Sequence, residues 1–137
     1  MRLALVGQWA LTAGVVLWLV ALLRTPEWLF PVGSLICHQR PERSFFVNGH
    51  QLAVCARCMG LYAGSALAAP AALIAASSLA RSQARRLAIA AALPTAITWS
   101  AEFAGLAHFS NLARFVAALP LGAAACGLVL GVLSEES

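Results

Sequence analysis

Long apolar runs alternate with short polar segments along the chain. The runs cover about residues 3–23, 54–80, 87–106 and 115–133. Each is close to or above the roughly 20 residues that an α-helix needs to cross a hydrocarbon core about 30 Å thick. The pattern therefore predicts an all-α polytopic membrane protein, in which a single domain, residues 1–137, contains four transmembrane helices.

Composition supports a bilayer environment. Hydrophobic residues make up 61% of the chain and charged residues 10%, whereas a soluble domain is about half apolar and one quarter charged. The formal net charge is +4, and every basic residue is an arginine. These arginines lie between the apolar runs and form no stripe, which is typical of topology signals and headgroup anchors. The lipid bilayer is the expected partner, and nucleic acid is not.

The first apolar run follows Arg2, as the core of a signal peptide would. It is longer than an ordinary signal-peptide core and has no A-x-A-like site at its end, so we interpret it as a retained helix. An even number of spans places both termini on one side, together with the basic segment 81–86. No acid offsets that segment, which favours termini inside and the first polar loop outside.

The polar loop between the first two spans, residues 24–54, differs in kind from the rest. Pro26, Pro31, Pro41 and Gly49 argue against one long helix here. The apolar residues 28–30 predict a short helix at the membrane interface.

The loop and the start of the second span contain a Cys/His motif. Cys37 and His38 are adjacent, and Cys55 and Cys58 form a C-A-R-C sequence. At the start of a helix, a spacing of three places both sulfurs on one face. Three thiolates and one imidazole in tetrahedral geometry suit zinc. The predicted metal ligands are therefore Cys37, His38, Cys55 and Cys58, with His50 in reserve; iron is the alternative to zinc.

Two other functions fit the same residues, because a C-x-x-C pair also serves redox and structural sites. The first is a membrane thiol–disulfide oxidoreductase that uses Cys55 and Cys58, with Cys37 as a resolving or exchanging thiol. The second is an accessory subunit of a larger membrane complex, or a homo-oligomer, whose small residues such as Gly60 and Gly64 allow close helix packing. Cys126, deep in the fourth run, is expected only to fill space.

Glu102 is the single acidic residue inside a predicted span, which makes it a functional candidate. It either pairs with Arg114 or Arg57 to tie helices together, or it accepts a proton or binds a metal. The expected topology puts it on the same side as the Cys/His loop. Whether the protein is an enzyme stays open, and the candidates for a catalytic role are Glu102, His108, Asn111, Arg114 and Arg57.

The stretch CHQRPERSFFVNGHQLAVCARCMGLYAG, residues 37–64, resembles DUF2085, a family of small predicted membrane proteins of bacteria and archaea. The family pattern pairs C-H-Q with C-x-R-C-x-G-x-Y-x-G. The later Ser110, Asn111 and Arg114 resemble a second element, S-N-x-x-R, whereas Ala53 stands where the family often has proline. The resemblance implies an integral protein of the prokaryotic plasma membrane with a Cys/His site, and it implies no particular reaction.

Overall fold

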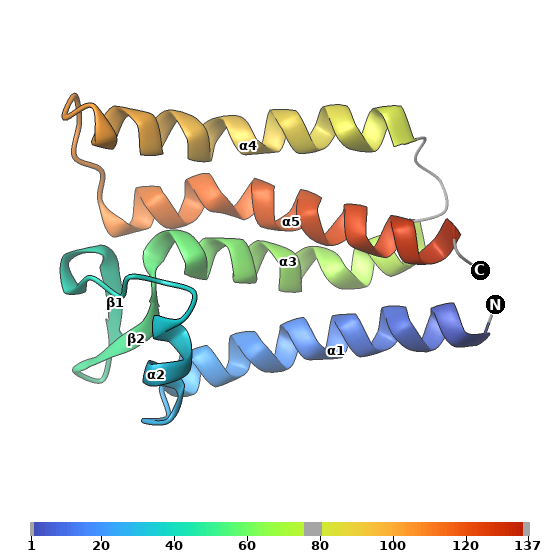
Figure 1. The fold of residues 1–137 in the computed structure, drawn as a ribbon, viewed down its shortest axis with the longest axis horizontal. Helices are drawn as coiled ribbons and strands as arrows, with labels where there is room; N and C mark the ends of the chain where they lie inside the picture. Colours follow the sequence, from blue (N-terminus) through green and yellow to red (C-terminus); the bar gives the residue numbers. More distant parts are fainter. Residues whose placement is uncertain (1, 76–80, 136–137) are drawn as a thin grey trace.

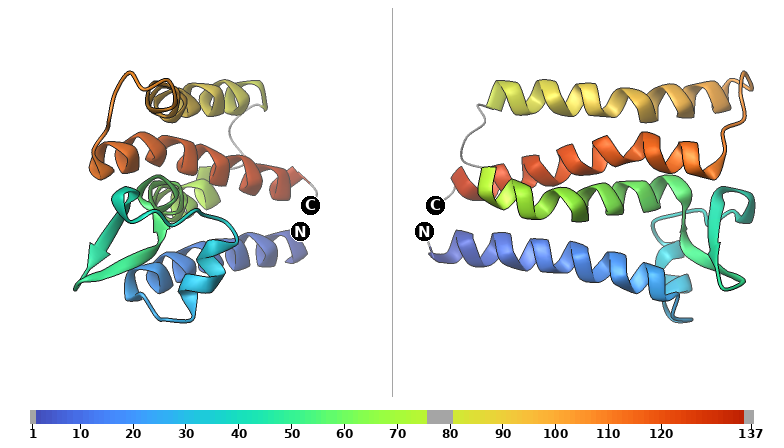
Figure 2. Two further views of the ribbon diagram at one scale, coloured as in Figure 1. Left: turned by 60° about the vertical axis from the view of Figure 1, so that its left-hand side comes forward. Right: turned by 180° about the vertical axis from the view of Figure 1, so that it is seen from behind.

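The computed structural model describes residues 2–75 and 81–135. In chain order, the elements are α1 (Arg2–Arg24), α2 (Leu29–Ser34), the short 3-10 helix η1 (Pro41–Arg43), β1 (Ser44–Val47), β2 (His50–Cys55), α3 (Ala56–Ala75), α4 (Arg81–Phe103) and α5 (Asn111–Glu135). The four long helices lie side by side in the order α4, α5, α3, α1 (Figures 1 and 2). The hairpin and α2 cover one end of this row, while α1 begins and α5 ends at the other.

The prediction of four transmembrane helices is wrong. The described residues form five α-helices and a two-stranded antiparallel sheet. By length and hydropathy, two of these helices could cross a membrane, over Leu5–Arg24 in α1 and Asn111–Leu133 in α5. The expected second span fails at its start because strand β2 includes Val54 and Cys55. Its last residues, 76–80, lie outside the described part of the chain.

The basic segment 81–86, predicted to lie between two spans, is helical, because α4 begins at Arg81. Arg85 and Arg86 therefore lie within a helix, where they make α4 more polar than the sequence interpretation assumed. The link between the last two helices is also shorter than the apolar runs indicate. The fourth run begins at residue 115, whereas α5 begins at Asn111 and thus includes Arg114.

A β-hairpin replaces the irregular loop expected before the second span. Val47 pairs with His50 in an antiparallel register, so Asn48 and Gly49 form a two-residue turn. Both have positive φ, 51° and 81°, which is the backbone conformation of a type I′ turn. The Asn-Gly dipeptide is a strong hairpin signal in a sequence, and the sequence interpretation missed it.

An apolar cluster fixes the hairpin to the helices. Leu22 of α1, Leu29 of α2, and Leu52 and Val54 of β2 are almost completely buried against one another and against Met59 of α3. Burying a side chain of this size stabilises a fold by about 2 kcal/mol. The end of α1, the short helix α2, strand β2 and the start of α3 therefore form one packed unit.

Small residues bring α3 and α5 into close contact. A Cβ added at Gly64 would overlap the Leu119 carbonyl oxygen, and one added at Gly122 would overlap that of Leu61. Ser65 Oγ donates to the Gly122 carbonyl oxygen at 2.8 Å. This is the packing that small residues allow between membrane helices, and the sequence predicted it for this segment of α3.

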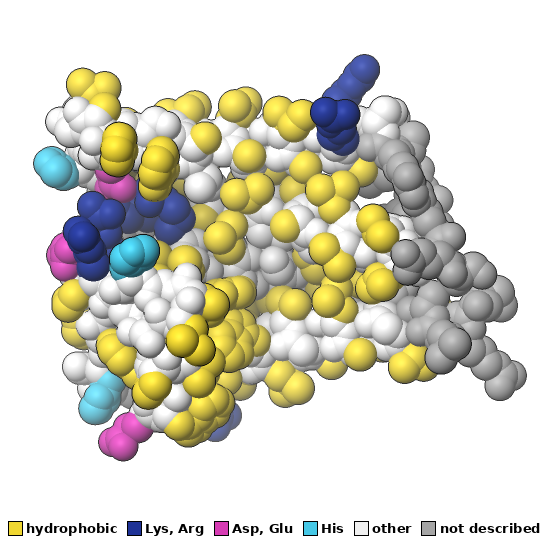
Figure 3. All heavy atoms as spheres, in the orientation of Figure 1, with side chains coloured by type: hydrophobic (Ala, Val, Ile, Leu, Met, Phe, Trp, Pro, Cys, Tyr) yellow, Lys and Arg dark blue, Asp and Glu magenta, His cyan; other side chains and the backbone are white. Residues whose placement is uncertain are grey.

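Charged side chains concentrate at the ends of the bundle. On the face shown in Figure 3, acidic, basic and histidine side chains gather at the end that carries the hairpin. Arginine side chains also lie near the opposite end, and the stretch between is covered by apolar and neutral side chains. An apolar surface that continues from a charged end suits a protein surrounded by lipid.

We predict that Gly64→Ala destabilises the bundle by about 1–3 kcal/mol, because its Cβ would push α3 away from α5. The matched control is Gly127→Ala in α5, where an added Cβ meets nothing within 4 Å. That change should be neutral or slightly stabilising, since alanine favours helix more than glycine does. Unfolding of both variants in detergent tests this, and equal stabilities would contradict the packing described.

Candidate metal centre

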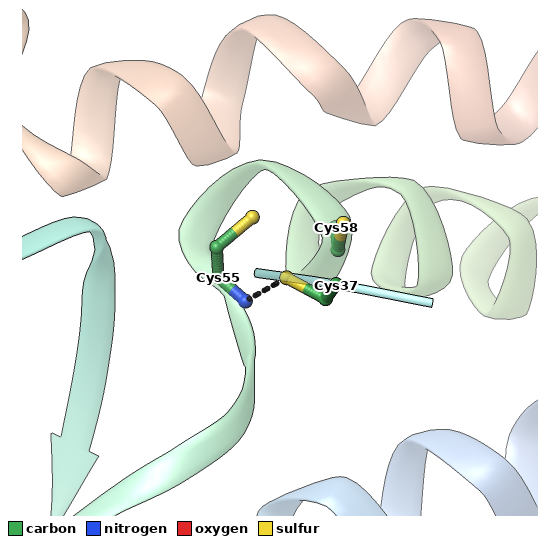
Figure 4. Close-up of side chains that lie close together, drawn as sticks. All are labelled: Cys37, Cys55 and Cys58. Carbon is green, nitrogen blue, oxygen red and sulfur yellow. Dashed lines mark hydrogen bonds between the residues drawn. The ribbon is translucent and has the colours of Figure 1, made fainter. Parts of the chain in front are cut away.

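Three cysteine side chains converge at the hairpin end of the bundle. The sulfurs of Cys37, Cys55 and Cys58 all lie within 4.8 Å of one another, a grouping that could hold a metal ion. Figure 4 shows Cys37 approaching from a separate segment toward the junction of β2 and α3. Cys37 is buried and packs in the apolar cluster, whereas Cys55 and Cys58 are half-buried.

Cys55 lies immediately before helix α3. It is the last residue of β2 and directly precedes Ala56, the first residue of the helix. The backbone N–H groups of Arg57 and Cys58 lie in the first turn of the helix, where they have no partner inside the helix, and both lower the pKa of the Cys55 thiol. The backbone N–H of Cys55 in turn donates to the Cys37 sulfur at 3.1 Å (Figure 4). The cysteine positions therefore follow from the place where strand becomes helix.

The environment favours the thiolate form of Cys55. A hydrogen bond with the Cys58 side chain lowers the pKa of Cys55 most; burial opposes this effect, and the backbone N–H groups reinforce it. The net result lowers the pKa of Cys55 from its ordinary value of 9.0 to about 5. Cys55 is therefore deprotonated at neutral pH, and the thiolate is the form that binds metals and attacks disulfides.

Polar contacts hold the segment that carries Cys37 against β2. The Cys37 N–H donates to the Gly33 carbonyl oxygen at 2.9 Å, and Gly33 lies so close to β2 that an added Cβ would overlap the Ala53 carbonyl oxygen. Gln39 has a left-handed backbone, with φ of 47°. Its Nε2 donates to the carbonyl oxygens of Phe30 at 2.7 Å and Ala53 at 2.8 Å.

Gln51 adds a second link between these segments. Its Nε2 donates to the Gln39 carbonyl oxygen at 2.6 Å and to Ser44 Oγ at 3.1 Å. The sequence interpretation missed both glutamines. The place of Gln39 within the C-H-Q element was the available signal for one of them, whereas nothing local distinguished Gln51.

The structure groups three of the four predicted metal ligands. His38 and His50 are exposed, and neither belongs to the three-sulfur group. Their roles as ligands stay predictions. Cys126 lies in α5, buried against Ala69 and Leu130 and outside the sulfur group, which agrees with the packing role expected for it.

A buried ion-pair network, here called the Glu102 bracket, lies beside the sulfur group and consists of Arg57, Glu102 and Arg114. Arg57 Nη2 pairs with Glu102 Oε2 at 3.0 Å, and Arg114 Nη2 pairs with Glu102 Oε1 at 2.6 Å. The three side chains are only 16%, 5% and 9% exposed, respectively. Since the residues come from α3, α4 and α5, the bracket joins three helices.

The bracket extends back to the hairpin. Arg114 Nη1 donates to Asn111 Oδ1 at 2.8 Å, and Asn111 Nδ2 donates to the Ser44 carbonyl oxygen at 2.9 Å. Ser44 is the strand partner of Cys55. The bracket is therefore connected to the cysteines at two points: through Arg57, which lies between Cys55 and Cys58 in the chain, and through Ser44, which pairs with Cys55 in the sheet.

The first residues of α5 place Asn111 and Arg114 for these contacts. Ser110 Oγ accepts a hydrogen bond from the Ala113 N–H at 3.2 Å, as an N-cap serine does. Within S-N-x-x-R, the serine therefore begins the helix, Asn111 holds the hairpin, and Arg114 pairs with the carboxylate.

Glu102 pairs with Arg57 and with Arg114, the two arginines named above as its possible partners. In this arrangement the ion pairs tie the helices together. Burial raises the pKa of Glu102, but hydrogen bonds from Arg114 and Arg57 outweigh it and lower this pKa from 4.5 to about 2. His108 is exposed on the link between α4 and α5. Catalytic roles for Glu102, His108, Asn111, Arg114 and Arg57 stay predictions.

The sequence comparisons agree with the resemblance noted above. A family described as "Predicted membrane protein (DUF2085)" matches residues 37–128, which include the three clustered cysteines and the Glu102 bracket. The chain belongs to the DUF2085 family. Two helices of suitable length and hydropathy accompany this assignment to a membrane protein family.

Two archaeal relatives, both uncharacterised proteins, match parts of the chain. One, from Methanocaldococcus jannaschii, is 67% identical over 36 residues, which cover 26% of this chain and 23% of that protein. The other, from Methanothermobacter thermautotrophicus, is 36% identical over 93 residues, 64% of this chain and 78% of that protein. No solved structure gave a significant match.

We predict that Glu102→Gln destabilises the protein by about 3–5 kcal/mol, because it leaves two buried arginines without a counter-charge. Glu42→Gln is the control, since Glu42 is an exposed acid at the same end of the bundle, and it should change stability by less than about 0.5 kcal/mol. Chemical unfolding in detergent measures both.

The stability difference between wild type and Glu102→Gln should depend on pH. The pKa of Glu102 is lowered on folding, so its stabilisation is complete above pH 4.5 and is lost as the pH falls toward about 2. The stability difference between wild type and Glu102→Gln should therefore shrink over that range. A difference that does not change with pH would contradict the ionised bracket.

Proposed function

We propose that this protein is a membrane-embedded metal-thiolate protein, in which Cys37, Cys55 and Cys58 bind a soft transition metal, with zinc as the first choice and iron as the alternative. The observation that carries the proposal is the convergence of three sulfurs within 4.8 Å. Zinc–sulfur bonds are about 2.3 Å long, so two sulfurs on one zinc ion are at most about 4.6 Å apart. In tetrahedral geometry the sulfurs are about 3.8 Å apart, so sulfurs within 4.8 Å of one another need to move by at most about 1 Å to bind one ion.

The chemistry of the three residues also fits. Thiolates are the ligands that zinc and other soft metals prefer. Cys55 is deprotonated at neutral pH because of its hydrogen bonds, and a bound cation would lower the pKa of the other two thiols. The apolar cluster behind Cys37 shields one side of the site, while the half-buried Cys55 and Cys58 leave the other side accessible.

The fourth position decides between a structural and a reactive centre. We propose His38, next to Cys37, as the fourth ligand and His50 as the reserve; the exposed His38 side chain would need to turn toward the sulfurs. Four protein ligands would make a closed, structural site. With three, an external ligand or water completes the site, and Glu102, His108 or Asn111 could assist a reaction there.

We also propose the prokaryotic plasma membrane as the location, with cytoplasmic termini and the cysteine cluster outside. The two archaeal relatives support the prokaryotic setting. The ribbon supports placing the start of α1 and the end of α5 on one side, because the hairpin lies at the other end of the bundle (Figure 1). Association into a homo-oligomer or a larger membrane complex stays a prediction.

We predict about one zinc or iron ion per chain in protein purified without chelator, measured by elemental mass spectrometry. Cys58→Ser should lose the metal, while Cys126→Ser should retain it because Cys126 is not part of the cluster. If His38→Ala loses the metal and His50→Ala does not, His38 is the fourth ligand. Wild-type protein without metal above background would overturn the proposal.

One observation favours a second function, thiol–disulfide exchange. Cys55 lies where β2 ends and α3 begins, and the neighbouring Cys58 side chain and the backbone N–H groups of the first turn lower the pKa of Cys55, an arrangement suited to nucleophilic attack. In this reaction, the Cys55 thiolate attacks a disulfide of a partner protein and releases one partner thiolate. The Cys58 thiolate then attacks the mixed disulfide, which leaves the Cys55–Cys58 disulfide and the fully reduced partner.

This second function predicts that Cys58→Ser accumulates a mixed disulfide through Cys55, because the second step is blocked. The control is Cys55→Ser, which lacks the attacking thiolate and should trap nothing. Thiol trapping with acid quenching, followed by non-reducing electrophoresis, measures both. Metal-bound wild type together with an untrapped Cys58→Ser variant would eliminate thiol exchange.

A further inference from the structure

Arg57 belongs to both polar groups at the hairpin end. It lies between Cys55 and Cys58 in the chain and belongs to the first turn of α3. Its side chain extends to the Glu102 carboxylate on α4. One residue therefore connects the sulfur group to the bracket, with its main chain on one and its guanidinium on the other.

The bracket carries an excess of positive charge. Two guanidinium groups share one carboxylate, and all three side chains are largely buried. Arg114 directs Nε and Nη2 to Glu102 and Nη1 to Asn111. Arg57, by contrast, makes one ion pair through Nη2, and within the described part of the chain its buried Nε has no hydrogen-bond partner. The excess charge is therefore associated with Arg57.

The sulfur group would carry the opposite excess. A divalent ion held by three thiolates has one negative charge left over, and a neutral histidine as fourth ligand does not change this. A buried charge is costly unless another charge compensates it. The positive excess of the bracket and the negative excess of a filled thiolate site are equal and lie at the same end of the bundle.

We propose, on the basis of the metal site proposed above, that Arg57 is the counter-charge and positioning residue of the metal–thiolate centre, with Glu102 holding its guanidinium in place. Arg57 does not touch the metal. Its charge favours the filled site, and its fixed position sets the first turn of α3, which contains Cys58 and directly follows Cys55. Arg24 and Arg40, the exposed arginines at this end, cannot replace it, because exposed charges are screened by solvent and salt.

The test measures zinc affinity by competition with a chromogenic chelator, using the full chain in detergent. Arg57→Gln should weaken zinc binding about 10–100-fold, the usual effect of removing a supporting residue around a metal site. Arg57→Lys should restore much of that loss, since it retains the charge without the planar guanidinium. Arg40→Gln is the matched control, because Arg40 is an exposed arginine at the same end, and its affinity should stay within about threefold of wild type.

The outcomes separate this inference from the proposed function. If wild type binds zinc and Arg57→Gln binds it equally well, Arg57 is not the counter-charge and the metal site stands. If Arg57→Lys loses as much affinity as Arg57→Gln, charge is not the reason, which also overturns the inference. If Arg57→Gln fails to fold, the comparison of Arg57→Lys with wild type decides. Wild type that binds no zinc overturns both proposals.

Discussion

The carboxylate of Glu102 is the contact on which the polar end of the molecule depends. It is almost completely buried and accepts hydrogen bonds from two arginines on two other helices. In an apolar environment such a group must have partners, so α3, α4 and α5 are constrained to meet at this point. Through Asn111 and Ser44, the same constraint reaches the hairpin.

Close helix contact makes this meeting possible. The backbones of α3 and α5 approach at Gly64 and Gly122 to a separation that no side chain would permit. Arg57 and Arg114, near the beginnings of the two helices, are thereby brought to the same carboxylate. The apolar cluster around Leu22, Leu29 and Val54 performs the corresponding task on the other side, where it anchors α2 and β2 to α1.

The cysteine group lies between these two supports. Cys37 packs in the apolar cluster, whereas Cys55 ends β2 and Cys58 lies in the first turn of α3, which Arg57 ties to the bracket. A site built in this way is preorganised, because strand-to-helix geometry, glutamine contacts and ion pairs each fix one part of it. Preorganisation of this kind suits a metal centre and also a reactive thiolate, which explains why both functions deserve a direct test.

Several features could be read from the amino-acid sequence. The family motif, the apolar character and the close packing of α3 through small residues all follow from residue type and spacing, whereas pairing with arginine was one of two interpretations for Glu102. These features depend on local chemistry. The hydrophobicity of an apolar run, the small size of glycine and the need of a buried acid for a partner are properties of the residues themselves, whatever the tertiary structure. The spacing of Cys55 and Cys58 likewise requires only that a helix begin between them.

The tertiary structure decided the rest. Hydropathy runs do not reveal where a strand ends and a helix begins, so four spans were expected where two described helices meet the criteria. The hairpin had a local signal at Asn48 and Gly49, but only its burial against α1 and α2 brings Cys37 to Cys55. That Glu102 takes both arginines, and that His38 stays outside the sulfur group, depends on distances between segments far apart in the chain. Such distances are set by packing, which residue spacing does not encode.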